Sequence, residues 1–185
     1  MTHGTQSPRD LVRPLVRTRQ IREFTPEPPT ALEIDALLEV ARWTGSASNQ
    51  QPWRFVLIRD AATLRRIADA GLPQTRPLLT APTAIAITLP NDPARQVHDS
   101  YDDGRVAERI LIGATMLGLG AGIAWIRADV RPAMTEILSL PADRFVRTLV
   151  AVGHPTEAAR RPKSEPGTAR LPLATLVAEE RWPTG

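Results

Sequence analysis

The stretch GSASNQQPW (residues 45–53) is a run of small and polar residues that leads directly into an apolar segment, Trp53 to Ile58. Its hydroxyl and amide groups are of the kind that a loop can present to a ligand. The apolar segment is short and rich in strand-forming residues, which predicts a β-strand. Taken alone, the stretch predicts a helix-to-strand connection, and such a connection needs no ligand.

A second stretch, RTRQIREF (residues 17–24), places several guanidinium groups just after an apolar helical pattern. Arginines can hold a phosphate through charge-assisted, bidentate contacts. An arginine-rich, solvated helix end explains this stretch about as well when it is considered by itself. A phosphate site here therefore needs support from another part of the chain.

Capping patterns predict the first three helices. Ser7 is expected to cap a helix that begins at Pro8, and Pro14 predicts either a kink in this helix or a later start. Thr30 and Glu33 form a capping box for a second helix, which is expected to end near residue 43. Asp60 is expected to cap a third helix, which ends near residue 71.

Three further apolar segments predict strands. Thr83 to Leu89 is apolar without interruption, which indicates burial on both faces and a place in mid-sheet. Gly122 to Ile126 and Arg147 to Val152 predict two more strands, separated by a short helix near Pro132 to Leu138. The segments together predict a sheet with helices around it.

The longest helix is expected to begin with Ser100 as its cap. Asp102 and Asp103 would then lie in its first turn, where the helix dipole favours negative charge. Neighbouring positions point to different faces of a helix, so we interpret these carboxylates as solvated charges and not as an acid–base pair. Gly118 is expected to end the helix.

The length of 185 residues allows one domain, residues 1–185, with a core over about 7–155. Residues 156–185 form a polar loop followed by an apolar stretch at 171–177, which needs a surface to pack on. In a chain this small, a second copy could provide that surface. A C-terminal extension is therefore expected.

Several classes of chemistry are excluded or disfavoured by the residues present. The chain has no cysteine, which excludes disulfides, thiolate metal sites and a cysteine nucleophile. His3, His98 and His154 are far apart and form no HExxH pattern, so no metal site is expected. The glycines of residues 118–122 lie between a helix and a strand, the reverse of the order that a dinucleotide-binding loop requires.

The distribution of charge and apolar residues limits the partners and the location. The formal net charge is +3, the basic residues are scattered and aromatic residues make up 4% of the chain, so no nucleic-acid partner is expected. The N-terminus has no apolar signal core, and no window approaches the roughly 20 apolar residues of a membrane span. A cytoplasmic protein without a membrane partner is expected.

Taken together, the two opening stretches resemble the nitroreductase family, whose members carry an RxSxRxF-like segment followed by a PSxxNxQPW-like loop. Residues 19–24 and 46–53 stand in these places. The turn at 118–120, the VGHP of 152–155 and the RLPL of 170–173 follow in the order of the family. The resemblance extends over nearly the whole chain.

The resemblance implies an α+β fold, nitroreductase-like, with a central, mostly antiparallel sheet flanked by helices. It also implies a homodimer in which the C-terminal extension packs on the partner and FMN lies at the interface. The implied function is an FMN-dependent oxidoreductase of the NAD(P)H nitroreductase type, which passes hydride from NADH or NADPH through N5 of the flavin. The acceptor would be an electron-poor small molecule such as a nitroaromatic or a quinone, in a ping-pong reaction.

Two other functions stay open at this point. A flavoenzyme of the same fold could carry out dehalogenation, enone reduction or flavin fragmentation. A non-catalytic protein could bind or sequester flavin. In the enzyme the flavin carries the chemistry, so no catalytic side chain is expected.

The resemblance implies cofactor-binding residues from three parts of the chain. Arg19, Gln20 and Arg22 would contact the ribityl phosphate or the pyrimidine edge, and Arg170 would reach the phosphate. Ser46, Ser48 and Asn49 would come from the opposite chain, and Gly122 and Ile123 would lie along the isoalloxazine. A cation such as Arg22 near the N1/O2 edge would stabilise the anionic reduced flavin.

Four positions depart from the pattern of the family. Thr18 and Thr168 stand where a basic residue is frequent, Gln20 stands where serine is usual, and Gly45 stands where proline is common. These departures predict a phosphate grip that is weaker, or that is rearranged around Arg17.

Overall fold

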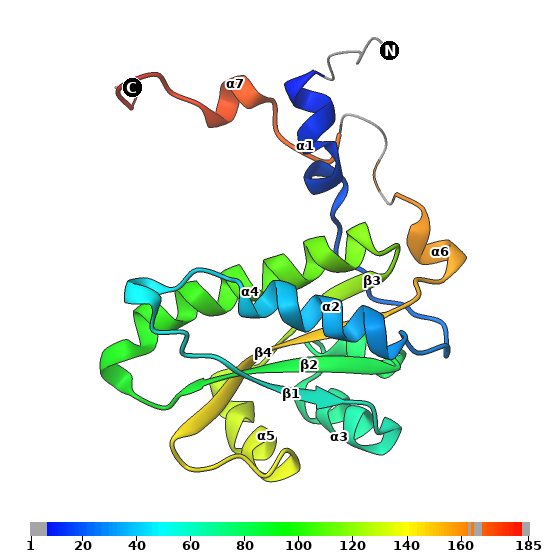
Figure 1. Cartoon of the computed structure of the whole chain (residues 1–185), viewed down its shortest axis with the longest axis vertical. Coiled ribbons are helices and arrows are strands. Elements are labelled where there is room, and N and C mark those ends of the chain that lie inside the picture. The colour runs from blue at the N-terminus through cyan, green and yellow to red at the C-terminus, as the bar shows by residue number, and fades with distance from the viewer. Residues whose placement is uncertain (1–6, 163, 165–167, 183–185) are drawn as a thin grey trace.

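The centre of the fold is an antiparallel, four-stranded sheet with the strand order β1-β2-β4-β3 (Figure 1). The computed structural model describes residues 7–162, 164 and 168–182. The strands are β1 (Arg54–Ile58), β2 (Thr83–Pro90), β3 (Gly120–Trp125) and β4 (Arg144–Gly153). Residues 83–89 of β2 are buried throughout, which confirms the predicted mid-sheet strand.

Helices cover both faces of the sheet, as expected for an α+β fold. In Figure 1, α2 (Ala31–Arg42) and α4 (Gln96–Met116) lie on one face, and α3 (Ala61–Gly71) and α5 (Arg131–Ile137) on the other. The period of two along β2 divides the core accordingly. Ala84 and Ala86 belong to the cluster under α3 and α5, whereas Ile85 and Ile87 belong to the cluster under α2 and α4.

The predicted caps of the first three helices are confirmed. The side chain of Ser7 accepts the Asp10 N–H at the start of α1 (Pro8–Arg17). Thr30 and Glu33 form the reciprocal capping box of α2. Asp60 caps α3. Each such cap stabilises its helix by about 1 kcal/mol, so these short local patterns set where the helices begin.

The longest helix begins earlier than predicted. Asp92 caps a 3-10 turn at Pro93–Arg95 that continues into α4 at Gln96, so Ser100 lies inside the helix. The prediction that Asp102 and Asp103 are solvated charges is wrong, because both residues are 2% exposed. The polar pattern around Ser100 resembles a helix start, but Asp92 before a proline supplies the real one.

The strands on either side of α5 are longer than predicted at their first ends. β3 begins at Gly120, and β4 begins at Arg144. The turn between α4 and β3 contains Gly118 at φ +75°, a conformation that glycine adopts at little cost. The predicted glycine at the end of the helix is therefore confirmed.

The first helix and residues 168–182 extend away from the sheet layers (Figure 1), whereas Ala159 packs against the core. The C-terminal part contains two short helices, α6 (Glu157–Arg160) and α7 (Leu173–Leu176). Apolar side chains remain exposed on both α1 and the tail: Leu11, Val12, Leu15, Val16, Leu171, Leu173, Leu176 and Val177. None of the helices in the described ranges is both long and apolar enough to cross a membrane.

The burial of Asp103 gives the fold a dependence on pH. Its Oδ2 accepts the Thr148 hydroxyl at 2.6 Å, while Oδ1 has no hydrogen-bond partner in the structure. Burial raises the pKa of Asp103 to about 6, against the opposing effects of the Thr148 hydrogen bond and the Arg147 charge. The folded chain thus binds this proton more tightly than the unfolded chain does. The stabilisation is complete below about pH 4 and is lost as the pH rises through 6.

We therefore expect Asp103→Asn to remove this dependence. Between pH 4 and pH 7.5, the wild-type protein should lose up to about 3 kcal/mol of unfolding free energy relative to the variant. Urea unfolding of both proteins at equal concentration across this range measures the difference. If the unfolding free energies of the two proteins differ by the same amount at every pH, Asp103 does not titrate in this way.

Candidate functional site

A surface cavity of about 490 Å³ gathers arginines from distant parts of the chain. It lies between the segment that follows α1, helix α4 and the C-terminal part, and its volume is in the range of small-molecule sites. Four of the predicted site residues line it: Arg19, Gln20, Arg22 and Arg170. The sequence order of these residues spans most of the chain, so the fold itself brings them together.

The segment after α1 is attached to the free edge of β3. The Ile21 N–H donates to the Ala121 carbonyl at 2.8 Å, and Gln20 forms a parallel bridge with Ala121. The Gln20 side chain accepts the Ile123 N–H through Oε1 at 2.7 Å. Gln20 and Ile123, both predicted as site residues, therefore contact each other directly and hold the segment in place.

Gly122 makes this attachment possible. A Cβ built on Gly122 would lie 1.9 Å from the Ile21 carbonyl oxygen, far inside any permitted contact. The glycine is therefore needed for the close approach of two backbones, one of which carries Arg19 and Arg22. This packing role stands beside the predicted place of Gly122 along a flavin, which stays a prediction.

Arg19 connects the same segment to the C-terminal part. Its guanidinium donates to the Arg160 carbonyl at 2.7 Å and to the Arg161 carbonyl at 3.2 Å. A guanidinium has five N–H donors, so donors remain for an anion in the cavity. These bonds also bring the Arg161 side chain to the cavity, a residue that the sequence analysis did not single out.

The cavity is predominantly positive. Arg19, Arg22, Arg161 and Arg170 line it together with one carboxylate, Glu108 of α4. Arg161 is paired with Glu157, but no ion pair in the described part of the chain involves Arg19, Arg22 or Arg170. A concave site lined by one sign of charge attracts ligands of the opposite sign. The cavity is therefore suited to a phosphate group.

The polar loop at residues 45–52 lies apart from this cavity in the same subunit. Ser46, Ser48 and Asn49 are absent from the cavity lining. The loop forms a 3-10 turn at Ala47–Asn49, and the Ser46 Oγ accepts the Gln51 N–H at 2.8 Å. Ser48 and Asn49 are exposed. One subunit thus does not bring the two predicted halves of the site together.

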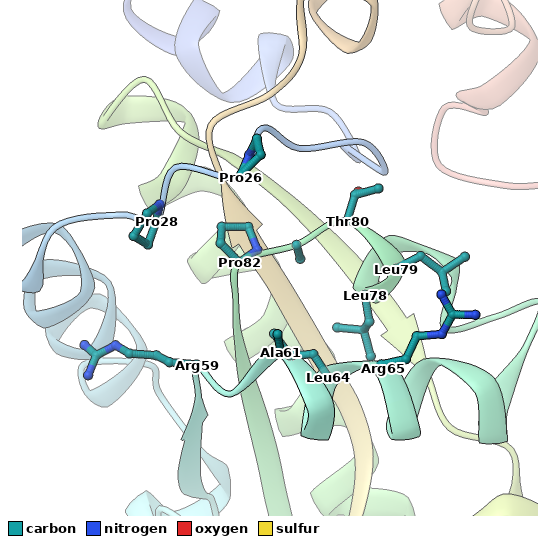
Figure 2. Close-up of a pocket in the computed structure, with 11 residues that line it drawn as sticks. Pro26, Pro28, Arg59, Ala61, Leu64, Arg65, Leu78, Leu79, Thr80 and Pro82 are labelled. Atoms are coloured by element: carbon teal, nitrogen blue, oxygen red, sulfur yellow. The ribbon is translucent and has the colours of Figure 1, made fainter.

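A second cavity, of about 480 Å³, has a different character (Figure 2). The rings of Pro26, Pro28 and Pro82 lie on one side, with Leu64 of α3 and Leu78 facing them. It contains none of the predicted site residues. Apolar residues make up most of its lining, and it contains two arginines, Arg59 and Arg65, against four in the first cavity.

Metal chemistry has no visible centre in the described residues. Within 7–162, 164 and 168–182, no group of three His, Cys, Asp or Glu side chains lies close enough to hold an ion. His3 lies outside these ranges.

The chain is an α+β fold whose antiparallel sheet has helices on both faces and a basic cavity at its β3 edge. Residues 15–78 match the model of the Nitroreductase family. A protein of Archaeoglobus fulgidus, provisionally named NADH dehydrogenase/NAD(P)H nitroreductase, is 28% identical over 145 residues, which cover 75% of this chain and 82% of that protein. A Bacillus subtilis protein named FMN reductase is 23% identical over 194 residues, which cover 94% of this chain and 74% of that protein.

Solved structures agree with this assignment of the fold. The solved structure of an FMN-dependent nitroreductase from Clostridium difficile superposes with a TM-score of 0.78 at 20% identity, and the match covers 91% of this chain and 98% of that one. The match to the family model and the names of these relatives agree with the resemblance that the sequence motifs predicted.

The role of Gly122 can be tested by adding the missing methyl group. Gly122→Ala should force the 19–22 segment away from β3 and lower the free energy of unfolding by about 1–3 kcal/mol, the usual cost of overpacking. Hydrogen exchange at the amides of Ile21 and Ile123 should become faster. Denaturant unfolding and hydrogen exchange measure both effects.

Gly104→Ala is the matched control, because a Cβ there meets nothing within 4 Å in the subunit. Alanine also favours a helix over glycine, so this variant should not lose stability. Equal behaviour of the two variants would contradict the packing role of Gly122.

Proposed function

We propose that the protein is a homodimeric, FMN-dependent oxidoreductase that transfers hydride from NADH or NADPH to an electron-poor acceptor such as a nitroaromatic or a quinone. The similarity to the nitroreductase family supports this class of reaction. The observation that carries the proposal for this chain is the cavity itself, in which Arg19 and Arg22 meet Arg170 from the far end of the sequence.

The arginines of the cavity would hold the ribityl phosphate of FMN. Guanidinium groups match phosphate oxygens in bidentate geometry. Arg17 lines a smaller, neighbouring cavity together with Arg160. Arg161, and not Arg17, is therefore the residue that we propose to replace the basic side chains missing at positions 18 and 168.

The protein would position the flavin and tune its charge without a nucleophilic side chain. When bound, FMN supplies the hydride chemistry, accepting hydride from NADH or NADPH and reducing the acceptor in a second half-reaction of a ping-pong cycle. Arg22, exposed in the cavity, would stabilise negative charge at the pyrimidine edge. Gln20 would keep the backbone of β3 rigid along the ring by holding the Ile123 N–H.

A second subunit would complete the site. The loop with Ser46, Ser48 and Asn49 does not line the arginine cavity of its own subunit. α1 and the tail expose a set of leucine and valine side chains, which a partner subunit would cover. We propose that the same association brings the loop of one subunit to the FMN of the other.

Binding and reduction of FMN test this function. The purified protein should bind FMN, turn yellow, and lose its flavin absorbance when NADH or NADPH is added without oxygen. An acceptor should restore the colour. Protein that binds no FMN would contradict the proposal, and bound flavin that neither nucleotide reduces would favour a flavin-binding protein without this activity.

Arg19→Ala should weaken FMN binding because a charge-assisted phosphate contact is lost. A loss of about 1.5–3 kcal/mol corresponds to a dissociation constant raised from about ten-fold to more than one-hundredfold. Fluorescence titration of FMN measures it. Arg66→Ala on α3, an exposed arginine outside the cavity, is the control and should bind FMN as the wild-type protein does.

Light scattering tests the oligomeric state. We expect a dimer of 20.3 kDa subunits that does not dissociate before it unfolds, since both the tail and the cofactor site are shared. A monomer that binds FMN tightly would contradict the shared site.

A further inference from the structure

A buried carboxylate on α4 binds the backbone of the polar loop. The Oδ2 of Asp102 accepts the Ala47 N–H at 3.1 Å, and its Oδ1 lies 3.3 Å from Nη1 of Arg105. Asp102 is 2% exposed. A charge is rarely buried unless it is paired and hydrogen-bonded, and here one of its partners is the loop that carries Ser46, Ser48 and Asn49.

Two more residues of α4 contact the segment that precedes Ala47. The Arg109 guanidinium donates to the Trp43 carbonyl at 2.9 Å. The Arg105 guanidinium covers Gly45, where an added Cβ would lie 2.9 Å from Nη2. The contact is with the flexible end of the Arg105 side chain, which lies beside the backbone of the loop.

These contacts form a regular series along one face of the helix. Positions 102, 105 and 109 are spaced i, i+3 and i+7, which places them on the same side of α4. They meet residues 47, 45 and 43 respectively, so helix and segment run in opposite directions. Residues 43, 45 and 47 each contact α4, so the segment that leads into the loop is held at every second residue.

The loop beyond this series has a strained backbone. Ser48, Asn49 and Gln51 have φ values of 49°, 53° and 47°, in the left-handed region that disfavours residues other than glycine. Such conformations persist when the surroundings hold them, and they cluster at functional sites. Asp102 binds Ala47, the residue directly before Ser48, which is the first strained position. It therefore fixes the backbone at the point where the turn begins.

We propose that Asp102 is a positioning residue for the flavin site. Together with Arg105 it fixes Ala47, and it thereby orients Ser46, Ser48 and Asn49 toward the FMN of the partner subunit. This inference rests on the proposed function, because the loop needs a fixed orientation only if it has a ligand to meet. Arg109 and Gly45 complete the restraint.

The first test compares two variants of Asp102 and a control, by their affinity for FMN and by the rate of amide hydrogen exchange in the loop. Asp102→Ala removes the acceptor and the charge, so the dissociation constant for FMN should rise about tenfold and amide exchange over residues 46–51 should become faster. Asp102→Asn keeps an oxygen that can accept the Ala47 N–H, and it should restore most of the affinity. Both readings are taken on the full-length dimer.

Asp99→Ala is the matched control. Asp99 lies one turn earlier on α4, is also 2% exposed and is paired with Arg95 at 3.1 Å, with no contact to the loop among its hydrogen bonds. Its loss should lower stability and leave the FMN dissociation constant unchanged. If Asp99→Ala and Asp102→Ala weaken FMN binding equally, the effect is general destabilisation and the inference fails.

A mixed dimer tests which site the loop serves. One subunit carries Asp102→Ala and the other carries Arg19→Ala, on chains with different purification tags. If the loop acts on the partner, one site carries both changes and the other carries neither, so about one FMN per dimer should bind with wild-type affinity. If the loop acts on its own subunit, each site carries one change and neither site keeps wild-type affinity, which overturns the inference.

Different results would contradict the proposed function and the role of Asp102. Wild-type protein that binds no FMN would contradict the proposed function. Wild-type protein that binds FMN while Asp102→Ala binds it equally well would contradict only the role of Asp102.

Discussion

The pairing of residues 20–21 with the edge of β3 is the constraint on which the rest of the structure depends. It consists of the Ile21 N–H bond to the Ala121 carbonyl, the Gln20 side chain on the Ile123 N–H, and the space left by Gly122. A free sheet edge presents unpaired backbone groups, which folded proteins commonly cover. Here the segment that covers the edge also carries Arg19 and Arg22, so one set of backbone contacts closes the sheet and places the cations.

The position of the C-terminal part follows from this pairing. Once Arg19 is held beside β3, its guanidinium reaches the carbonyls of Arg160 and Arg161 and turns the beginning of the tail toward the same cavity. Arg170 then lies on the wall of the cavity with Arg161. The positive cavity is therefore a product of the fold, since an arginine-rich stretch by itself would be a solvated helix end.

Local patterns in the sequence predicted the parts of the fold that local physics decides. The caps at Ser7, Thr30 and Asp60 were predictable because a side chain three residues away satisfies the free N–H groups. The start of α4 was not, since the residues around Ser100 resemble a helix start while the helix begins after Asp92. Asp102 and Asp103 therefore lie inside the helix, where both are buried. Burial of that kind depends on contacts such as Asp103 with Thr148, 45 residues apart in sequence.

The same distinction holds for the candidate site. The residue types of 19–22 and 45–53 were visible as motifs. The resemblance to the family turned their order into a prediction of cofactor-binding residues. Arg161 was not visible, because its place depends on bonds from Arg19 to backbone carbonyls. The guanidinium of Arg105 lies beside Gly45, a contact that the sequence could not show.

A crystal structure of the protein in complex with FMN tests most directly whether the arginine cavity and the partner's loop hold one flavin. The account predicts one FMN per subunit, with its phosphate bonded to the guanidinium groups of Arg19, Arg22 or Arg170 and its ring against residues 46–49 of the partner subunit. A structure in which FMN binds elsewhere, or in which the arginine cavity and the partner's loop are too far apart to touch one ligand, would contradict it.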